Sequence, residues 1–213
     1  MKEGFIKMKK KRKINFKRIF LLLAIGVIAF VSIKLYFSER VYDKEGVFPE
    51  EVYGVKVNTE IIENHTEARS GKKRKIKYLV IHETDNTAIG STAKNHSEFL
   101  SKNNKTSTSW HYTVDDKEIY HHIPDNEIAH HAATQDGNQY GVGIELCVNE
   151  DGNFEKTFDN GAKLVAYLLK EYDLPIKSIK THHDFSGKDC PHNILKDDRM
   201  KEFTNKVKEY MKQ

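Results

Sequence analysis

Residues 77–82 read Lys77-Tyr78-Leu79-Val80-Ile81-His82, and this short run decides the fold. Its apolar residues, bounded by a lysine and a histidine, are typical of a buried β-strand. Working outward along the chain, further strands are expected over residues 110–114, 118–123, 127–132, 141–148 and 176–181. The first two of these flank Asp115-Asp116-Lys117, a turn sequence that predicts a β-hairpin.

Three other segments have a helical pattern. Residues 91–102 fit a short helix with Ser91 as N-cap, and residues 157–172 place their apolar side chains on one stripe. Residues 197–211 are amphipathic in the same way. Strands interleaved with helices predict an α/β fold: a single domain over residues 76–213 with a central mixed β-sheet flanked by helices.

Charge is unevenly distributed along the 213 residues. Residues 1–18 contain nine Lys/Arg and a single acid, Glu3. Without this segment, the totals of 35 Lys+Arg and 31 Asp+Glu leave a net charge of about −4 for the rest of the chain. A mildly acidic body argues against nucleic-acid binding by bulk charge.

The segment that follows the basic tail predicts a membrane anchor. Residues 19–33 carry no charge, and the apolar run 19–37 would span roughly 28 Å as a helix, close to the ~30 Å hydrocarbon core. Because basic flanks stay inside, residues 1–18 are expected to form a cytoplasmic tail, with the rest outside a single-pass anchor in the cell membrane. A cleaved signal peptide is the alternative. Residues 38–75 are polar and without sustained periodicity, which predicts a tether. Short apolar alternation over residues 52–57 leaves open an edge strand packed on the domain.

A cluster of metal-binding residue types lies near the C-terminus. Residues 181–192 hold His182, His183, Cys190 and His192 on a Gly-containing loop, and imidazole with thiolate is the donor set that Zn²⁺ prefers. Three protein ligands would leave one position open for water, which zinc activates near neutral pH. The residues alone leave a second interpretation open, a disulfide between Cys190 and Cys147.

Five segments of the chain carry a family resemblance, and they occur in the family's order: residues 78–84, 109–116, 129–132, 142–147 and 182–191. Residues 76–195 resemble the type-2 N-acetylmuramoyl-L-alanine amidases, a zinc-dependent family that includes phage lysozyme-like endolysins and peptidoglycan-recognition proteins. The last segment is the most specific, because it places a lysine six residues and a cysteine eight residues after a ligand histidine. The resemblance implies that residues 76–213 form a catalytic domain acting on peptidoglycan.

The resemblance also implies a role for individual residues. His82, His182 and Cys190 would bind one catalytic Zn²⁺, and the reaction would hydrolyse the amide between the lactyl group of N-acetylmuramic acid and L-alanine. Glu145 would act as acid and base, and Lys188 would face the oxyanion. Without the family, strand alternation does not exclude that Glu145 is a solvent-facing strand residue, and an exposed loop cation is the favoured interpretation of Lys188.

Two further residues are expected to contact substrate. His131 resembles the histidine of a family Ala-Trp-His-Ala segment that lines the substrate groove, although His130 replaces the tryptophan here. Trp110 stands where some relatives carry a catalytic tyrosine, so it is expected to contact substrate without transferring a proton. The partners expected are therefore peptidoglycan and a membrane, with no nucleic acid and no obligate protein partner.

Two rival functions remain at this point. The first is a peptidoglycan-binding module with the same fold but no catalysis. The second is a structural zinc domain, which would need a fourth protein ligand, with His183 and His192 as the candidates.

Overall fold

The computed structural model describes residues 17, 22–32, 50–102 and 106–213. The chain divides into two compact units, Met1–Arg40 and Val41–Gln213. In the first unit, residues 22–32 are helical and their large apolar side chains are exposed. Among the described residues, no helix combines the length and the apolar character that crossing a membrane requires. The rest of the expected anchor at 19–37 lies outside the described residues, and the anchor stays a prediction.

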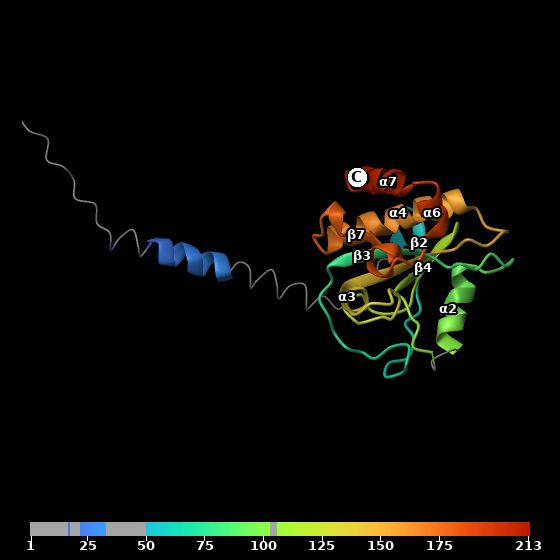
Figure 1. Ribbon diagram of the computed structural model, residues 1–213, viewed down its shortest axis with the longest axis horizontal. Helices are drawn as coiled ribbons and strands as arrows, with labels where there is room; N and C mark the ends of the chain where they lie inside the picture. Colours follow the sequence, from blue (N-terminus) through green and yellow to red (C-terminus); the bar gives the residue numbers. More distant parts are fainter. Residues whose placement is uncertain (1–16, 18–21, 33–49, 103–105) are drawn as a thin grey trace, which may run out of the picture. The chain divides into compact units, whose positions relative to one another are not determined.

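The second unit is built on one seven-stranded sheet (Figure 1). Along the described chain its strands are β1 (Glu51–Val52), β2 (Val55–Thr59), β3 (Tyr78–Glu83), β4 (Tyr112–Val114), β5 (Glu118–His121), β6 (Gly141–Leu146) and β7 (Ile179–Thr181). In space the order is β1-β2-β5-β4-β6-β3-β7. β3 runs parallel to both β6 and β7, whereas β4 and β5 form the expected antiparallel hairpin. The predicted mixed sheet is confirmed.

Helices cover the sheet and close the unit. They are α2 (Ala93–Lys102), α3 (Gln135–Tyr140), α4 (Phe154–Glu171), α5 (His182–Ser186), α6 (His192–Lys196) and α7 (Met200–Tyr210). α4 begins where the Asn153 side chain accepts a hydrogen bond from the Lys156 backbone N–H, and it packs against β3, β4 and β6. α7 packs on α4, and the two lie together in Figure 1.

Burial between α4 and the sheet shows which strand side chains point toward α4 and which point to the other face. Leu79 and Ile81 of β3, with Val142 and Ile144 of β6, are fully buried in the same apolar cluster as Phe158 of α4. Because side chains alternate along a strand, the residues between them point to the opposite face. His82 and Glu145 are therefore on the face turned away from α4.

The tether predicted over residues 38–75 does not hold from residue 50 onward. β2 pairs in parallel with β5, which makes this segment part of the sheet. Further along, the Arg69 guanidinium donates to both carboxylate oxygens of Glu127, at 2.7 and 3.0 Å. Residues 50–75 thus belong to the folded domain, and the remainder of the predicted tether, residues 38–49, lies outside the described residues.

The strand predicted over residues 127–132 is also wrong. Within the described chain this segment makes only an isolated bridge, between Lys73 and Glu127. Side chains form hydrogen bonds with several of its backbone groups. The Glu127 carbonyl accepts from Arg74 Nε at 2.7 Å, and Asn138 Oδ1 accepts from the backbone N–H of His131 and of Ala132. These bonds replace a strand ladder.

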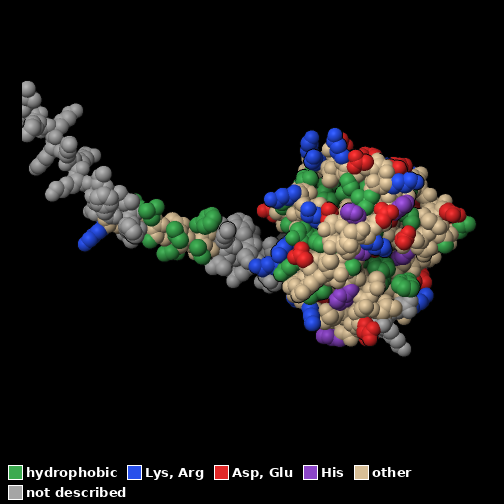
Figure 2. All heavy atoms as spheres, viewed as in Figure 1, with side chains coloured by type: hydrophobic (Ala, Val, Ile, Leu, Met, Phe, Trp, Pro, Cys, Tyr) green, Lys and Arg blue, Asp and Glu red, His purple; other side chains and the backbone are tan. Residues whose placement is uncertain are grey.

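Acidic and basic side chains are interspersed over the face of this unit shown in Figure 2.

The remaining difference from the expected elements concerns residues 176–181. Ile176–Ser178 form a 3₁₀ turn, and only Ile179–Thr181 pair as β7. That turn delivers β7 to the edge of the sheet beside β3, where the candidate site begins.

Candidate metal and catalytic site

Two strands place one site residue each at their carboxyl ends. His82 of β3 and Glu145 of β6 are direct partners in the parallel register. Both lie on the face away from α4, so their side chains lie side by side on that face. Glu145 is not a solvent-facing strand residue, because its side chain is only 15% exposed. Its role as acid and base stays a prediction.

A tight loop brings the other two candidate ligands to the same place. His182 opens α5 immediately after β7, where Thr181 and Asp184 form a capping box. Gly187, with φ 74°, ends α5 in the left-handed conformation that glycine adopts readily. The chain then folds back, so that the His183 backbone N–H donates to the Cys190 carbonyl at 3.0 Å.

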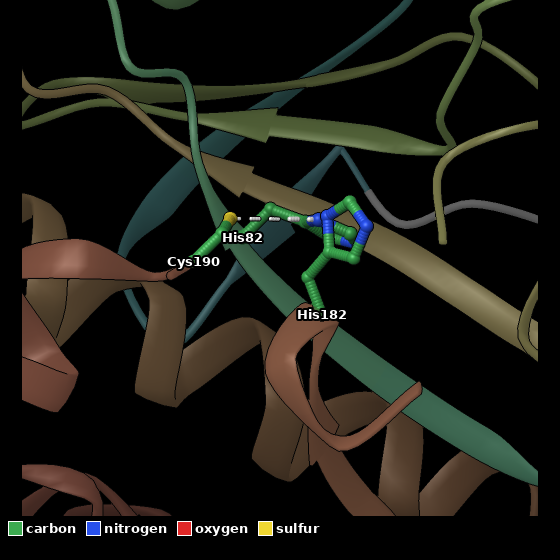
Figure 3. A group of neighbouring side chains, drawn as sticks. All are labelled: His82, His182 and Cys190. Atoms are coloured by element: carbon green, nitrogen blue, oxygen red, sulfur yellow. Dashed lines mark hydrogen bonds between the residues drawn. The ribbon is translucent and has the colours of Figure 1, made fainter. Parts of the chain in front are cut away.

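His82, His182 and Cys190 converge (Figure 3). One donor atom from each lies within 4.8 Å of the donor atoms of the other two, and all three residues are buried. Cys190 Sγ is 3.8 Å from His82 Nδ1. In the part of the chain that the structure describes, this group contains no fourth His, Cys, Asp or Glu, and both His183 and His192 are exposed.

The donor set fits a metal ion on two further observations. His182 Nε2 is buried and has no hydrogen-bond partner, although a buried polar atom normally has one. Both cysteines are free thiols, so the disulfide alternative does not hold. Burial lowers the pKa of both His82 and His182, so both rings are neutral and able to coordinate at neutral pH.

Glu145 lies beside this group with an unused oxygen. Its Oε1 is 3.9 Å from His82 Nδ1, and its Oε2 is buried without a hydrogen-bond partner. Burial raises the pKa of Glu145 to about 8, while the charge of Lys188 acts in the opposite direction. Lys188 is exposed on the loop before Cys190, and it lines a cavity together with Glu145 and the three candidate ligands.

A cavity of about 510 Å³ opens over these residues. An adjoining hollow of about 410 Å³ shares Thr84, His96 and Trp110 with it and extends to Phe99 of α2. A space of this size can take a sugar or a short peptide.

The two residues expected to contact substrate line the cavity but also have partners inside the protein. Trp110 is 7% exposed, and its Nε1 donates to Thr113 Oγ1 at 2.7 Å. His131 is also 7% exposed, and its Nδ1 is 2.9 Å from His82 Nε2. Contact of either residue with substrate stays a prediction.

One residue of the site was missed at the level of sequence. Glu83, next to His82, points to the other face and accepts three hydrogen bonds, from the backbone N–H of Asn193 and Ile194 and from the Asn193 side chain. It thereby fastens the first turn of α6, two residues beyond Cys190. The sequence signal that could have identified Glu83 is its place directly after the candidate ligand His82.

Fold and site together define a class: an α/β domain with a candidate site for one metal ion, and an acid beside it, at the carboxyl edge of a mixed sheet. Residues 72–193 match the family described as N-acetylmuramoyl-L-alanine amidase (Amidase_2), and the chain belongs to this family. This confirms the resemblance found in the sequence.

Individual relatives agree with the family. The chain is 39% identical over 156 residues to the N-acetylmuramoyl-L-alanine amidase CwlH of Bacillus subtilis (strain 168), covering 72% of this chain and 61% of CwlH. It is 43% identical over 120 residues to XlyA of the same organism, covering 55% of this chain and 40% of XlyA. The solved structure of the catalytic domain of XlyA superposes with a TM-score of 0.68 at 37% identity, over 72% of this chain and 99% of that domain. The chain thus spans less than two thirds of the length of these curated relatives.

Proposed function

We propose that this chain is a zinc-dependent N-acetylmuramoyl-L-alanine amidase that cleaves the amide between the lactyl group of N-acetylmuramic acid and L-alanine in peptidoglycan. The observation that carries the proposal is the convergence of His82, His182 and Cys190 beside an acid with a free, buried oxygen. The family and the relatives named as amidases support it.

The three ligands would be His82 through Nδ1, His182 through its unpartnered Nε2, and Cys190 through Sγ. Bound zinc supplies Lewis acidity and makes water a nucleophile near neutral pH. With three protein ligands, a tetrahedral site would keep one position open for water or substrate. A fourth protein ligand would be needed for a purely structural zinc.

Glu145 would carry the proton. Its unpartnered Oε2 accepts a proton from the attacking water as the carbon–oxygen bond forms, then returns it to the departing nitrogen as the carbon–nitrogen bond breaks. The raised pKa suits both halves of this transfer. Lys188 would place its ammonium near the developing oxyanion, and the products are a lactyl carboxylate and a free amino group on L-alanine.

Digestion of purified peptidoglycan tests the proposal. We expect new N-terminal alanine without new reducing ends, with products identified by mass. A chelator should abolish the release and added zinc should restore it. Binding to peptidoglycan without any release of alanine would instead favour the binding module.

We further propose that residues 19–37 anchor the chain in the cell membrane, with residues 1–18 in the cytoplasm. The nine Lys/Arg of residues 1–18 and the helical residues 22–32 with their exposed apolar side chains support this. We expect the full chain in the alkali-washed membrane fraction, with its domain digested by protease added to intact protoplasts. Recovery of a protein whose intact mass lacks the first residues would contradict the anchor and favour a cleaved signal.

A further inference from the structure

The two ring nitrogens of His82 face opposite sides of the ring's surroundings, one toward the candidate metal site and one toward His131. Nδ1 faces the candidate metal site, 3.8 Å from Cys190 Sγ and 3.9 Å from Glu145 Oε1. Nε2 faces away from it and lies 2.9 Å from His131 Nδ1. The two rings meet edge to face, at an interplanar angle of 89°. The proton on His82 can therefore occupy either the ligand side or the rear side.

The far nitrogen of His131 decides which side it occupies. His131 Nε2 lies 3.1 Å from the Gly141 carbonyl oxygen, which can only accept a hydrogen bond. His131 Nε2 therefore carries the proton of this buried neutral ring, and its Nδ1 presents a lone pair. His82 must then donate from Nε2, which leaves the lone pair of His82 Nδ1 directed at Cys190 and Glu145.

The surroundings hold the His131 ring in this position. A Cβ at Gly143 would lie 2.7 Å from His131 Cγ, so only glycine leaves space for the ring against β6. The backbone on either side of the ring is also fixed, because Asn138 Oδ1 accepts from the N–H of His131 at 2.9 Å and of Ala132 at 2.7 Å. A ring clamped this way provides a fixed acceptor.

We propose that His131 is a positioning residue for metal binding: it holds His82 in the tautomer and orientation in which Nδ1 coordinates. This inference rests on the proposed zinc function. It gives His131 a role that acts through His82, in addition to any contact with substrate. Partners of this kind typically change metal affinity or activity by about 10–100-fold when removed.

An isosteric pair of substitutions tests the inference in the full chain. His131→Leu removes the acceptor, whereas His131→Asn keeps an amide oxygen near the position of Nδ1. Zinc affinity, measured by competition with a chromophoric chelator, should fall about 10–100-fold in His131→Leu and return to within about threefold of wild type in His131→Asn. His122→Leu is the control, because His122 is also buried (0% exposed, against 7% for His131) but bonds Thr113 Oγ1 and does not line the cavity.

A second measurement needs no variant. Nitrogen NMR of the metal-free full chain should show His82 protonated at Nε2 and bare at Nδ1. A proton on His82 Nδ1, or equal zinc affinity in His131→Leu and wild type, would overturn the inference, as would an Asn variant as weak as the Leu variant. If the wild-type protein binds no zinc at all, both the proposed function and this inference fail. If the wild type binds zinc and His131→Leu binds it equally well, only the inference fails, so the two failures are distinguishable.

Discussion

Glu145→Gln is expected to lower kcat for release of N-terminal alanine by about 10²- to 10⁴-fold, the range typical of a lost general acid–base group. Glutamine keeps the shape of the side chain but cannot take a proton from water. Because the three candidate ligands are untouched, zinc content and thermal stability should stay near the wild-type values. Initial rates on purified peptidoglycan, with zinc measured on the same samples, check this.

The matched control is Glu118→Gln. Glu118 lies on β5, accepts a hydrogen bond from Asn58 Nδ2 at 2.7 Å, and does not line the cavity. Its turnover should equal that of wild type. Full turnover in Glu145→Gln would remove the acid–base assignment, while loss of zinc in that variant would show that Glu145 has a structural part in the site.

The candidate ligands His82, His182 and Cys190 were implied by the family resemblance. The residues of the loop 181–192 alone indicated a zinc site but left a disulfide between Cys190 and Cys147 open. The place of Glu145 could not be predicted in the same way. Its direction depends on which face of β6 is covered by α4, and its nearness to His82 depends on a parallel register that no local pattern encodes.

The elements that the sequence left open or missed are short or pair with distant segments. The alternation over residues 52–57 allowed an edge strand but did not reveal its partner, because β2 has five residues and its parallel partner β5 lies about sixty residues further on. α5 and α6 have five residues each, too few for a periodic pattern. α6 forms where Glu83, more than a hundred residues earlier, accepts from its first backbone N–H groups.

The role of His131 illustrates the same limit. In the sequence it is one of two adjacent histidines between alanines, and nothing local separates His130 from His131. Their difference arises in three dimensions, where the His131 ring packs against Gly143 of β6. A family pattern can single out the residue but does not reveal that its Nδ1 lies 2.9 Å from Nε2 of the candidate ligand His82.

The two cysteines allow the sharpest test of the metal site. Both are buried and free, Cys190 at 5% and Cys147 at 1% exposure, yet only Cys190 belongs to the ligand group. Cys190→Ser should weaken zinc binding by about 70- to 900-fold, because 10–16 kcal/mol for a four-ligand zinc site is roughly 2.5–4 kcal/mol per ligand. Cys147→Ser should leave zinc affinity unchanged and lower only the free energy of unfolding, because a hydroxyl replaces a buried thiol.

The pH dependence of zinc affinity gives this comparison a second readout. Burial raises the pKa of the metal-free Cys190 thiol to about 12, so at neutral pH zinc must displace its proton. The pKa values of His82 and His182 are lowered, so both rings are already neutral and release none. Affinity in wild type and in Cys147→Ser should therefore rise as pH rises from 6 to 8, and Cys190→Ser should lose most of this slope. Equal affinities and equal slopes in the two serine variants would show that Cys190 is not a ligand, and the hydrolytic mechanism built on it would fall.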